Sequence, residues 1–528
     1  MAAAVRPMSV LAFPVAGARK LSAVRSRRAG FPHLIAGGRL PYDPRSTIVD
    51  TLEIRHLVGT TWEGDPALER INPARPDDVV TISAVGDAKT VDRALDAADA
   101  AWQEWRATPA PVRGEILLRA ADLLERRSDE VAVDLTREEG KTLSEATGEV
   151  RRAIAVLRFF GGEGWRIGGS TYPSSVGDGL IYTRREPVGI VAAITPWNFP
   201  IAIPAWKIAP ALVAGNAVVL KPAQITAGSA WHLVSSLLEA GIPPGVLSLV
   251  NGPGSVVGNA LVGDPRVAAV TFTGSVAVGK AIFGRLAARR ARTQLEMGGK
   301  NALVVLDDAD PATAARIAAI GGFGLTGQAC TATSRVICTP KVKPAFLEAF
   351  VEETGRYQPG DGLNAGVLMG PVVSQDQASS NRSYVEAARA VGSTPITRGD
   401  IESGLFQPPV IVTDVGVDDR IAQEEVFGPV VAVIEAADLD EALAFTDATS
   451  YGLAAGIVTN DLRAAQRFAN EVQAGVVKVN EATSGVALNV PFGGVKDSST
   501  NTFREQGSGA IDFFTWSKSV YLTPPSWS

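Results

Sequence analysis

The chain of 528 residues is predicted to fold as an α/β protein, in which short strands alternate with amphipathic helices. Strand-like runs at 188–194, 217–220, 247–250 and 268–272 each lead into a turn and then a helical pattern. That order is typical of successive βαβ units and a parallel sheet. The hydrophobic share of 46% is ample for buried cores, and the length indicates more than one domain-sized unit.

Helical spacing of apolar residues dominates the chain before the first of these runs. The pattern predicts helices over 90–107, 111–127 and 131–138. A break at Gly140-Lys141 precedes a long helix over 144–161. The sequence therefore predicts a helix-rich opening, followed by strands and helices in alternation.

The second half repeats the alternation. Strand-like runs at 301–306 and 334–338 flank a helix over 311–321, whose Pro311 suits a first helical turn. Later strands are predicted at 430–435, 455–458 and 476–479. The stretch 513–522 alternates like an edge strand that could add to a partner's sheet.

Composition excludes several functional classes. A net charge of −6 argues against nucleic acid as a partner. Cys330 and Cys338 cannot form a disulfide framework or a typical zinc site, so we expect no metal centre and a reducing, cytoplasmic setting. None of the three histidines lies in a candidate catalytic stretch, which leaves Cys-His chemistry little support. The apolar run 188–220 is interrupted by Asn, Lys and Pro residues, so we expect no membrane span.

Residues 1–53 differ in composition from the rest. Up to Tyr42 the chain has seven basic residues and no acidic one, which can mimic a mitochondrial transit peptide. A disordered extension, or an upstream start codon in an Arg- and Ala-rich coding sequence, explains the pattern better. We therefore assign these residues to an extension outside the folded domains.

One cysteine stands out because of its surroundings. Cys330 closes the sequence Gly-Gln-Ala-Cys, and a thiol becomes a nucleophile when it ionises. Asn198 lies on a segment bounded by prolines, and Glu296 precedes a Gly-Gly turn. A lone cysteine is more often a small buried hydrophobe, so the other two residues decide the interpretation.

These stretches, in this order, resemble the aldehyde dehydrogenase superfamily. The resemblance runs from about Ile54 to the C-terminus and rests on five motifs: Thr-Pro-Trp-Asn-Phe-Pro at 195–200, Gln-Leu-Glu-Met-Gly-Gly-Lys-Asn at 294–301, Gly-Gln-Ala-Cys at 327–330, Pro-Phe-Gly-Gly-Val-Lys at 491–496 and Arg-Glu-Gln-Gly at 504–507. It implies a dinucleotide-dependent oxidation of aldehydes to acids.

The resemblance implies a two-step acyl transfer. The Cys330 thiolate attacks the aldehyde carbon, and the Asn198 amide and the Cys330 backbone N–H stabilise the oxyanion. Hydride leaves to a nicotinamide, and Glu296 activates the water that hydrolyses the thioester. Lys207 and Glu505 match a family pair that moves the proton onward.

The implied cofactor is NADP or NAD. Gly252-x-Gly254-x-x-x-Gly258 by itself fits a plain tight turn better than a phosphate site, and it gains weight from the Thr273-Gly274-Ser275 turn after the next strand. Gln224 stands where NAD-preferring relatives often carry Glu, which predicts a preference for NADP, with use of both cofactors as the alternative. The residues that the family places against the cofactor are Thr195, Pro196, Trp197, Lys221, Gln224, Gly254, Gly258, Gly274, Ser275, Glu425 and Phe427.

The family fold implies three parts. Residues 54–165 and 188–297 are expected to form a Rossmann-like cofactor domain, and 298–500 an α/β catalytic domain. Residues 166–187 and 501–528 are expected to form a small β oligomerisation arm, which makes a homodimer or homotetramer the expected assembly.

The sequence further resembles the family's enzymes for short semialdehydes such as 2,5-dioxopentanoate. Arg166 is the predicted ligand of the substrate carboxylate, and Thr483 a second substrate residue; a structural Arg at a helix end is the alternative for the first. A succinic semialdehyde or broad-range enzyme is an alternative, since position 324 is Gly and 329 is Ala. An acylating coenzyme A-dependent enzyme is another alternative, but it would not need Glu296. A non-catalytic relative is a further one, but it would not need Cys330, Glu296 and Asn198 together.

Overall fold

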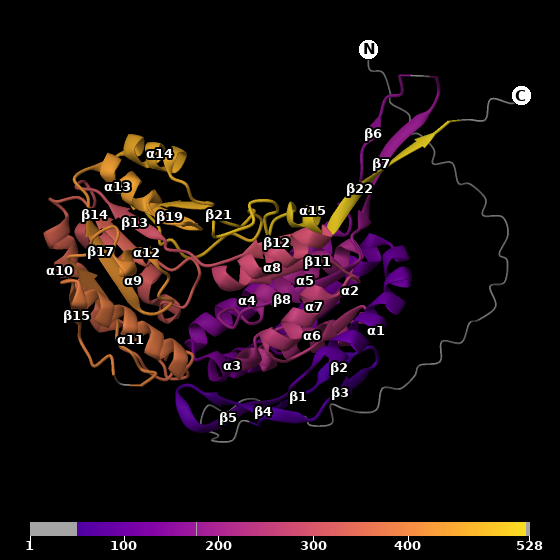
Figure 1. The fold of residues 1–528 in the computed structure, drawn as a ribbon, viewed down its shortest axis with the longest axis horizontal. Helices are drawn as coiled ribbons and strands as arrows, with labels where there is room; N and C mark the ends of the chain where they lie inside the picture. The colour runs from indigo at the N-terminus through magenta and orange to yellow at the C-terminus, as the bar shows by residue number, and fades with distance from the viewer. Residues whose placement is uncertain (1–49, 176, 403, 524–528) are drawn as a thin grey trace, which may run out of the picture. The chain divides into compact units, whose positions relative to one another are not determined.

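The computed structural model describes residues 50–175, 177–402 and 404–523 (Figure 1). The predicted extension, residues 1–53, lies outside these ranges apart from its last four residues. Leu52 and Glu53 belong to strand β1 (Leu52–Ile54), so they are part of the fold and not of an extension. Within the described ranges, no helix is both long and apolar enough to cross a membrane.

The first described elements are strands, and the prediction of a helix-rich opening is wrong for this part. β1 pairs in parallel with β5 (Arg75–Ala84), which pairs antiparallel with β4 (Pro66–Asn72). β2 (His56–Val58) and β3 (Thr61–Glu63) join the edge of a larger sheet. Strands of three residues are too short for an alternating pattern to stand out in the sequence.

The four predicted helices are confirmed as α1 (Ala88–Ala107), α2 (Ala110–Arg126), α3 (Ser128–Glu139) and α4 (Leu143–Glu163). Gly140 ends α3 with a φ of 107°, in the left-handed region that glycine favours. The Thr142 hydroxyl caps the first turn of α4, and the Glu145 carboxylate caps the Thr142 N–H in return. This tight connection positions the start of α4.

The first large sheet has seven strands, and its five-strand parallel portion confirms the predicted βαβ units. The strand order is β12 (Arg292–Glu296), β11 (Val267–Thr273), β8 (Ile190–Ile194), β9 (Ala217–Lys221), β10 (Leu247–Leu249), β2 and β3, the last two antiparallel. The connecting helices are α5 (Ala202–Ala214), α6 (Ala227–Glu239), α7 (Asn259–Gly263) and α8 (Val276–Arg289). Alternate residues of β8 enter two different cores, so both faces of the sheet are buried.

The second large sheet also has seven strands, all parallel except the edge strand β15. Its order is β15 (Thr394–Thr397), β16 (Val410–Thr413), β17 (Val430–Glu435), β14 (Arg335–Cys338), β13 (Ala302–Val305), β19 (Ala454–Val458) and β20 (Val476–Val479). Its helices are α9 (Pro311–Phe323), α10 (Lys343–Glu353), α11 (Gln375–Ala390), α12 (Arg420–Gln423), α13 (Leu439–Asp447) and α14 (Leu462–Glu471). Here too the strands β13 and β14 separate two apolar cores.

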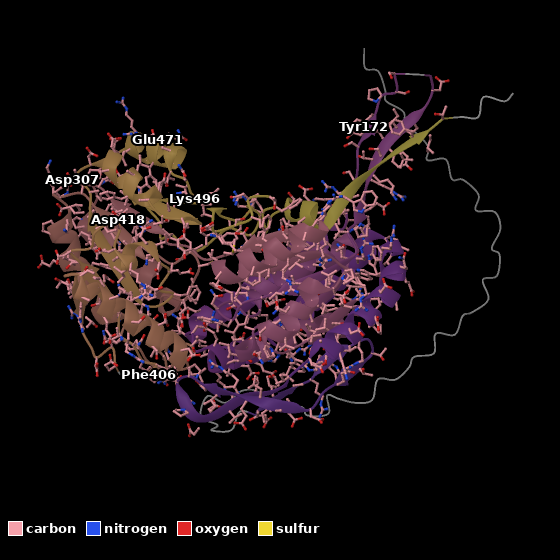
Figure 2. The ribbon with its side chains drawn as sticks, viewed as in Figure 1. Tyr172, Asp307, Phe406, Asp418, Glu471 and Lys496 are labelled. Atoms are coloured by element: carbon pink, nitrogen blue, oxygen red, sulfur yellow. The ribbon has the colours of Figure 1, made fainter. Side chains whose placement is uncertain are left out.

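A smaller antiparallel sheet combines β6 (Thr171–Tyr172), β7 (Leu180–Pro187) and β22 (Thr515–Leu522), as expected for the arm. β22 follows the short helix α15 (Ala510–Phe514) and pairs with β7 along its full length. The elements β18 (Tyr451–Gly452) and β21 (Val495–Lys496) form a two-stranded ladder. Tyr172, on β6, is half exposed (Figure 2).

Candidate active site

Cys330 lies on the loop between α9 and β14, just after the short turn η3 (Gly324–Gly327). The backbone of Leu325, Thr326 and Gly327 is left-handed, with φ values of 53°, 57° and 66°. A residue with a side chain costs of order 1–3 kcal/mol in such a conformation. Contacts from elsewhere in the chain must therefore hold this loop.

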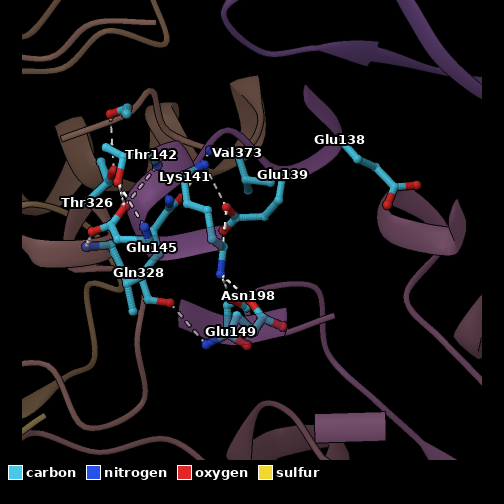
Figure 3. A network of polar contacts seen from close by, with 12 residues as sticks. Glu138, Glu139, Lys141, Thr142, Glu145, Glu149, Asn198, Thr326, Gln328 and Val373 are labelled. Carbon is cyan, nitrogen blue, oxygen red and sulfur yellow. Dashed lines mark hydrogen bonds and ion pairs between the residues drawn. The ribbon is translucent and has the colours of Figure 1, made fainter. Parts of the chain in front are cut away.

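Three hydrogen bonds provide that support (Figure 3). The Leu325 N–H donates to Glu145 Oε1 at 2.7 Å, the Thr326 hydroxyl to the Gly370 carbonyl at 3.0 Å, and the Val373 N–H to Gln328 Oε1 at 2.9 Å. The first of these partners belongs to the capped turn of α4. The position of the cysteine thus depends on a helix that begins almost two hundred residues earlier in the chain.

The Cys330 side chain is partly exposed, yet it sits in an environment that opposes ionisation. Burial, and next the charges of Glu425, Glu296 and Glu505, raise the pKa of the thiol to about 12. An ordinary cysteine has a pKa near 8.5. At neutral pH Cys330 is therefore a thiol, and nucleophilic attack requires an acceptor for its proton.

Asn198 reaches the cysteine loop directly. This residue is buried in the turn after β8, and its Nδ2 donates to the Gln328 carbonyl oxygen at 3.0 Å. Because a primary amide has two N–H donors, one remains for another acceptor. The predicted oxyanion donor is thus brought to the backbone two residues before Cys330.

A buried lysine holds the Asn198 turn in place. Lys141 Nζ donates to the Asn198 carbonyl oxygen at 2.6 Å and to Glu149 Oε2 at 2.7 Å (Figure 3). Glu149 Oε1 accepts the N–H groups of Ile201 and Ala202 at the start of α5, at 3.0 and 3.1 Å. Charged hydrogen bonds in a buried setting are stronger than neutral ones, so this network fixes the turn firmly.

Glu296 ends β12 and is almost completely buried. The Ser499 hydroxyl donates to Oε1 at 3.0 Å, and the Gly494 N–H donates to Oε2 at 3.2 Å. Burial, and next the charge of Glu505, raise the pKa of Glu296 well above its ordinary value. A carboxyl group with a raised pKa is a stronger base when it is ionised.

Lys207 and Glu505, predicted to work together, form a buried ion pair. Lys207 Nζ also donates to the Thr271 hydroxyl at 3.0 Å, and that hydroxyl donates to Gln294 Oε1 at 2.9 Å. The second carboxylate oxygen of Glu505 has no hydrogen-bond partner in the part of the chain that the structure describes. The pair can therefore accept one further hydrogen bond.

Glu425 and Phe427 lie next to the cysteine loop. The Gly299 N–H donates to Glu425 Oε1 at 3.0 Å, and burial raises the pKa of this carboxyl to about 7. The ring of Phe427 meets the ring of Trp197 edge-on, with centroids 5.3 Å apart. A small hollow, lined in part by Gly327 and Ala329, adjoins both residues and the cysteine loop. These three predicted cofactor residues are thus close to one another.

The remaining predicted cofactor residues gather along the carboxyl edge of the first sheet. The strands β11, β8, β9 and β10 are neighbours, so the turns that follow them share one edge. The predicted cofactor residues at these strand ends and in the turns after them are Thr195, Pro196, Lys221, Gln224, Gly254, Gly258, Gly274 and Ser275. Gly254 and Gly258 bound a short π-helical turn that runs into α7.

This edge suits a polar ligand with phosphate groups. Lys221 Nζ is buried and donates to the Pro222 carbonyl oxygen at 2.8 Å, and burial lowers the pKa of Lys221 to about 8. Among the described residues, the hydroxyls of Thr195 and Thr273 and the Asn251 amide are buried without a partner. Such groups cost of order 1–3 kcal/mol unless a ligand or water pairs with them. The residues present therefore fit a dinucleotide.

The two predicted substrate residues are placed differently from the others. Arg166 follows α4 and pairs with Glu163 at 3.1 Å, with its side chain largely exposed. About 27 Å of helix separates Glu163 from Glu145, which holds the cysteine loop, at 1.5 Å per residue. Thr483 is fully buried and donates to the Thr331 carbonyl at 2.7 Å. The structure does not bring Arg166 to the site, and Thr483 supports the chain just after Cys330.

Sequence reasoning missed the supporting residues of the site. Gly140-Lys141 was assigned only as a break between helices, although Lys141, Glu145 and Glu149 connect the Asn198 turn to the cysteine loop. The capping pattern Thr142-x-x-Glu145 was a usable signal for the start of α4. Which buried partners these charges meet could not be deduced from local sequence.

Comparison with known proteins gives a consistent result. The model of the Aldehyde dehydrogenase family matches residues 61–520. An alpha-ketoglutarate semialdehyde dehydrogenase from Haloferax volcanii is 48% identical over 467 residues, covering 87% of this chain and 96% of the relative. A 2,5-dioxopentanoate dehydrogenase from Saccharolobus solfataricus is 46% identical over 455 residues, covering 85% of this chain and 95% of the relative.

A solved structure shares the fold. The betaine aldehyde dehydrogenase from Staphylococcus aureus, in complex with NAD+, superimposes with a TM-score of 0.85 at 33% identity. The match covers 89% of this chain and 95% of that one.

Proposed function

The chain belongs to the aldehyde dehydrogenase family, and from that premise we propose that it oxidises a short semialdehyde bearing a carboxylate, through a thioester on Cys330. It is an NAD(P)-dependent oxidoreductase that acts on aldehydes. The observation that carries the proposal is the hydrogen bond from Asn198 to the loop of Cys330. This bond holds an amide donor close to Cys330, which is partly exposed, whereas Cys338 is buried.

The first half of the reaction is addition to the aldehyde. Cys330 Sγ bonds to the carbonyl carbon, and the proton of its thiol passes to solvent. The negative charge that develops on oxygen meets the free N–H of the Asn198 amide and the Cys330 backbone N–H. Each donor of this kind commonly contributes about 3 kcal/mol to the transition state.

A nicotinamide cofactor would supply the acceptor for the hydride that the tetrahedral carbon loses. The carbon remains on Cys330 as a thioester. Lys221, Gly254, Gly258, Gly274 and Ser275 are the residues that would hold the dinucleotide along the first sheet, and Glu425 and Phe427 would hold it beside the cysteine loop.

The second half is hydrolysis of the thioester. Glu296 removes a proton from water, the hydroxide attacks the acyl carbon, and the Cys330 thiol is released with the carboxylic acid. Lys207 and Glu505 take the proton from Glu296 onward, and the unpartnered oxygen of Glu505 provides the acceptor. One aldehyde and one water thus yield one acid, one hydride and one proton.

The substrate class rests on the relatives. Enzymes named for alpha-ketoglutarate semialdehyde and for 2,5-dioxopentanoate, two names for one compound, match nearly the whole of this chain at 46–48% identity. A five-carbon aldehyde with a carboxylate at its far end is therefore the proposed substrate, with succinic semialdehyde as the competing one.

The test is a comparison of aldehydes under one assay. Absorbance of the reduced nicotinamide would follow 2,5-dioxopentanoate, succinic semialdehyde and pentanal, each with NAD and with NADP. A kcat/KM for dioxopentanoate at least tenfold above that for pentanal, or about 1.4 kcal/mol, is expected. A smaller ratio contradicts recognition of the carboxylate, and dependence on coenzyme A contradicts hydrolysis.

We also propose that the enzyme is a homodimer or homotetramer assembled through the arm sheet. β22 is an edge strand, and several large apolar side chains on this sheet are exposed: Tyr172, Leu180, Trp516, Tyr521 and Leu522. Exposed apolar groups on an unpaired edge favour association with another chain. Light scattering of the enzyme and of Tyr521→Glu tests this proposal, and a monomeric parent enzyme contradicts it.

Two free cysteines are consistent with a cytoplasmic setting.

A further inference from the structure

Arg152, on a helix that supports the active site, is a cation without an acidic partner in the part of the chain that the structure describes. It lies on α4, is partly buried, and its Nη2 donates to Gln506 Oε1. Among the residues that the structure describes, no carboxylate pairs with it. Burial lowers the pKa of Arg152, whereas Glu125 and Asp122 raise that of Arg158 on the same helix. A guanidinium has five N–H donors, and four of those on Arg152 are left for a ligand or water.

Gln506 provides a second unpaired donor. Its side chain is fully buried, and its Nε2 has no hydrogen-bond partner within the described part of the chain. The orientation of this amide is fixed, because a guanidinium can only donate and so must face the Gln506 oxygen. The backbone of Gln506 is left-handed, with a φ of 59°, a conformation that costs energy for a residue with a side chain. A strained residue with a buried, unsatisfied donor is typical of a binding position.

Along the chain, Arg152 and Gln506 are close to residues that support the active site. Gln506 follows Glu505, the partner of Lys207. Arg152 is one helical turn beyond Glu149, which holds the start of α5 just after Asn198. One helical turn rises about 5.4 Å. Arg152 and Gln506 are thus joined by a hydrogen bond, and each is a near neighbour along the chain of a residue that supports the active site.

We propose that Arg152 and Gln506 bind the carboxylate of the substrate, at the end remote from the aldehyde. A carboxylate accepts a bidentate pair of bonds from a guanidinium and can accept an amide N–H as well. It would satisfy the charge of Arg152 and the buried Nε2 of Gln506 together. This assignment rests on the proposed function and replaces Arg166 as the residue that recognises the carboxylate.

The geometry of α4 favours Arg152 over its neighbours. Arg151 points to solvent, and Arg166 follows the helix at its far end, where it pairs with Glu163. Arg158 is engaged by Asp122 and Glu125. Of these four arginines, Arg152 is the one that is not exposed, and it has no carboxylate partner among the described residues.

The experiment compares Arg152→Met with Arg151→Met, a matched change one residue away on the exposed face. The measured quantity is the ratio of kcat/KM for 2,5-dioxopentanoate to that for pentanal, with thermal unfolding as a check on folding. A lost charged hydrogen-bond pair corresponds to roughly a 10- to 100-fold fall in this ratio. We expect that fall in Arg152→Met, mainly through KM, and a change below threefold in Arg151→Met. Gln506→Asn, which tolerates the left-handed backbone but has a shorter side chain, should lower the ratio by a smaller factor.

The outcomes separate the two proposals. If the parent enzyme prefers dioxopentanoate and Arg152→Met keeps that preference, the assignment of Arg152 is wrong and the proposed substrate stands. If the parent enzyme has no preference, the proposed substrate falls, and the assignment with it. Equal loss on both aldehydes indicates a structural role and overturns the assignment. Should Arg152→Met fail to fold, Arg152→Lys retains the charge without the planar fork, and an unchanged ratio in that variant contradicts bidentate binding.

Discussion

The side-chain amide of Asn198 donates to the carbonyl oxygen of Gln328, 3.0 Å away and two residues before Cys330. Asn198 follows a strand of the first large sheet, whereas Gln328 precedes a strand of the second. The bond therefore connects the turns of two sheets at the nucleophile. It fixes the amide near the thiol before a substrate arrives, so little reorganisation is needed during the reaction.

Removal of this amide should lower catalysis more than binding. We expect Asn198→Asp, which keeps the shape but offers no N–H, to lower kcat by about 10²–10³-fold with a small change in KM. Asn198→Ala should show a similar fall. Steady-state kinetics on the same aldehyde measures both variants. Retention of the parent kcat in Asn198→Asp would exclude the amide as an oxyanion donor.

Variants of Glu296 and Cys330 should separate the two half-reactions in kinetic measurements. In Glu296→Gln, hydrolysis should slow by about 10²–10⁴-fold, because the general base is lost, while the first turnover still reduces one cofactor per site. Rapid mixing should show that burst. Cys330→Ala is the control, since it should bind cofactor and give no burst. A Glu296→Gln enzyme that turns over at the parent rate would sink the proposed hydrolysis step.

The raised pKa of Cys330 should be measurable in the enzyme without cofactor. With a pKa of about 12, its thiolate fraction rises about tenfold for each pH unit between 7 and 10, so alkylation by iodoacetamide should rise likewise without a plateau. Glu425→Gln removes a nearby negative charge and should lower the pKa and speed alkylation at a given pH. Mass spectrometry can identify the alkylated residue, with buried Cys338 as an internal control. A plateau near pH 8 would contradict the raised pKa.

Cofactor choice should depend on Gln224, which begins the short helix η1 (Gln224–Thr226) after Lys221. We expect the parent enzyme to accept NADP in preference to NAD, and Gln224→Glu to shift the kcat/KM ratio toward NAD. A carboxylate near the 2′-phosphate costs of order 1–4 kcal/mol at a partly solvated site. Gln224→Met, which adds no charge, is the control. An NAD preference above tenfold in the parent would show that this position does not set the choice.

The pH dependence of NADP binding should follow Lys221. Because burial lowers the pKa of its ammonium to about 8, the charged form predominates below that pH and declines above it. Affinity for NADP should therefore fall as the pH rises from 7 to 9, and more steeply than affinity for NAD. Fluorescence titration with each cofactor measures the difference. The same slope for both cofactors would contradict a contact between Lys221 and the 2′-phosphate.

The buried cluster around Lys141 should be important for stability. In Lys141→Met the carboxylates of Glu149 and Glu139 lose their buried cation, which should lower the free energy of unfolding by about 3–5 kcal/mol. Lys141→Met with Glu149→Gln should recover part of that loss. Urea unfolding of the single and double variants measures the coupling. Additive losses in the double variant would show that the two side chains do not interact.

Much of the fold was predictable because its signals are local. The helices α1 to α4 and the strands β8, β9 and β11 follow from spacing that a few neighbouring residues display. The short strands β1 to β3 were not predicted, since three residues give no period and their pairing partners lie elsewhere in the chain. Cys330, Asn198 and Glu296 were found through motifs, which also are local.

The sequence by itself thus determined the alternation of elements, the family resemblance and the residue types of the chemistry. Only the tertiary structure decided which side chains meet. It pairs Lys207 with Glu505 across 298 positions, and it connects Glu145 to the cysteine loop. It also places Arg152 beside Gln506 in the middle of α4, and Arg166 beyond the end of that helix. The physical reason is that the part of α4 from Arg152 to Glu163 spans about 16 Å, so two arginines that look equivalent in sequence can reach quite different surroundings.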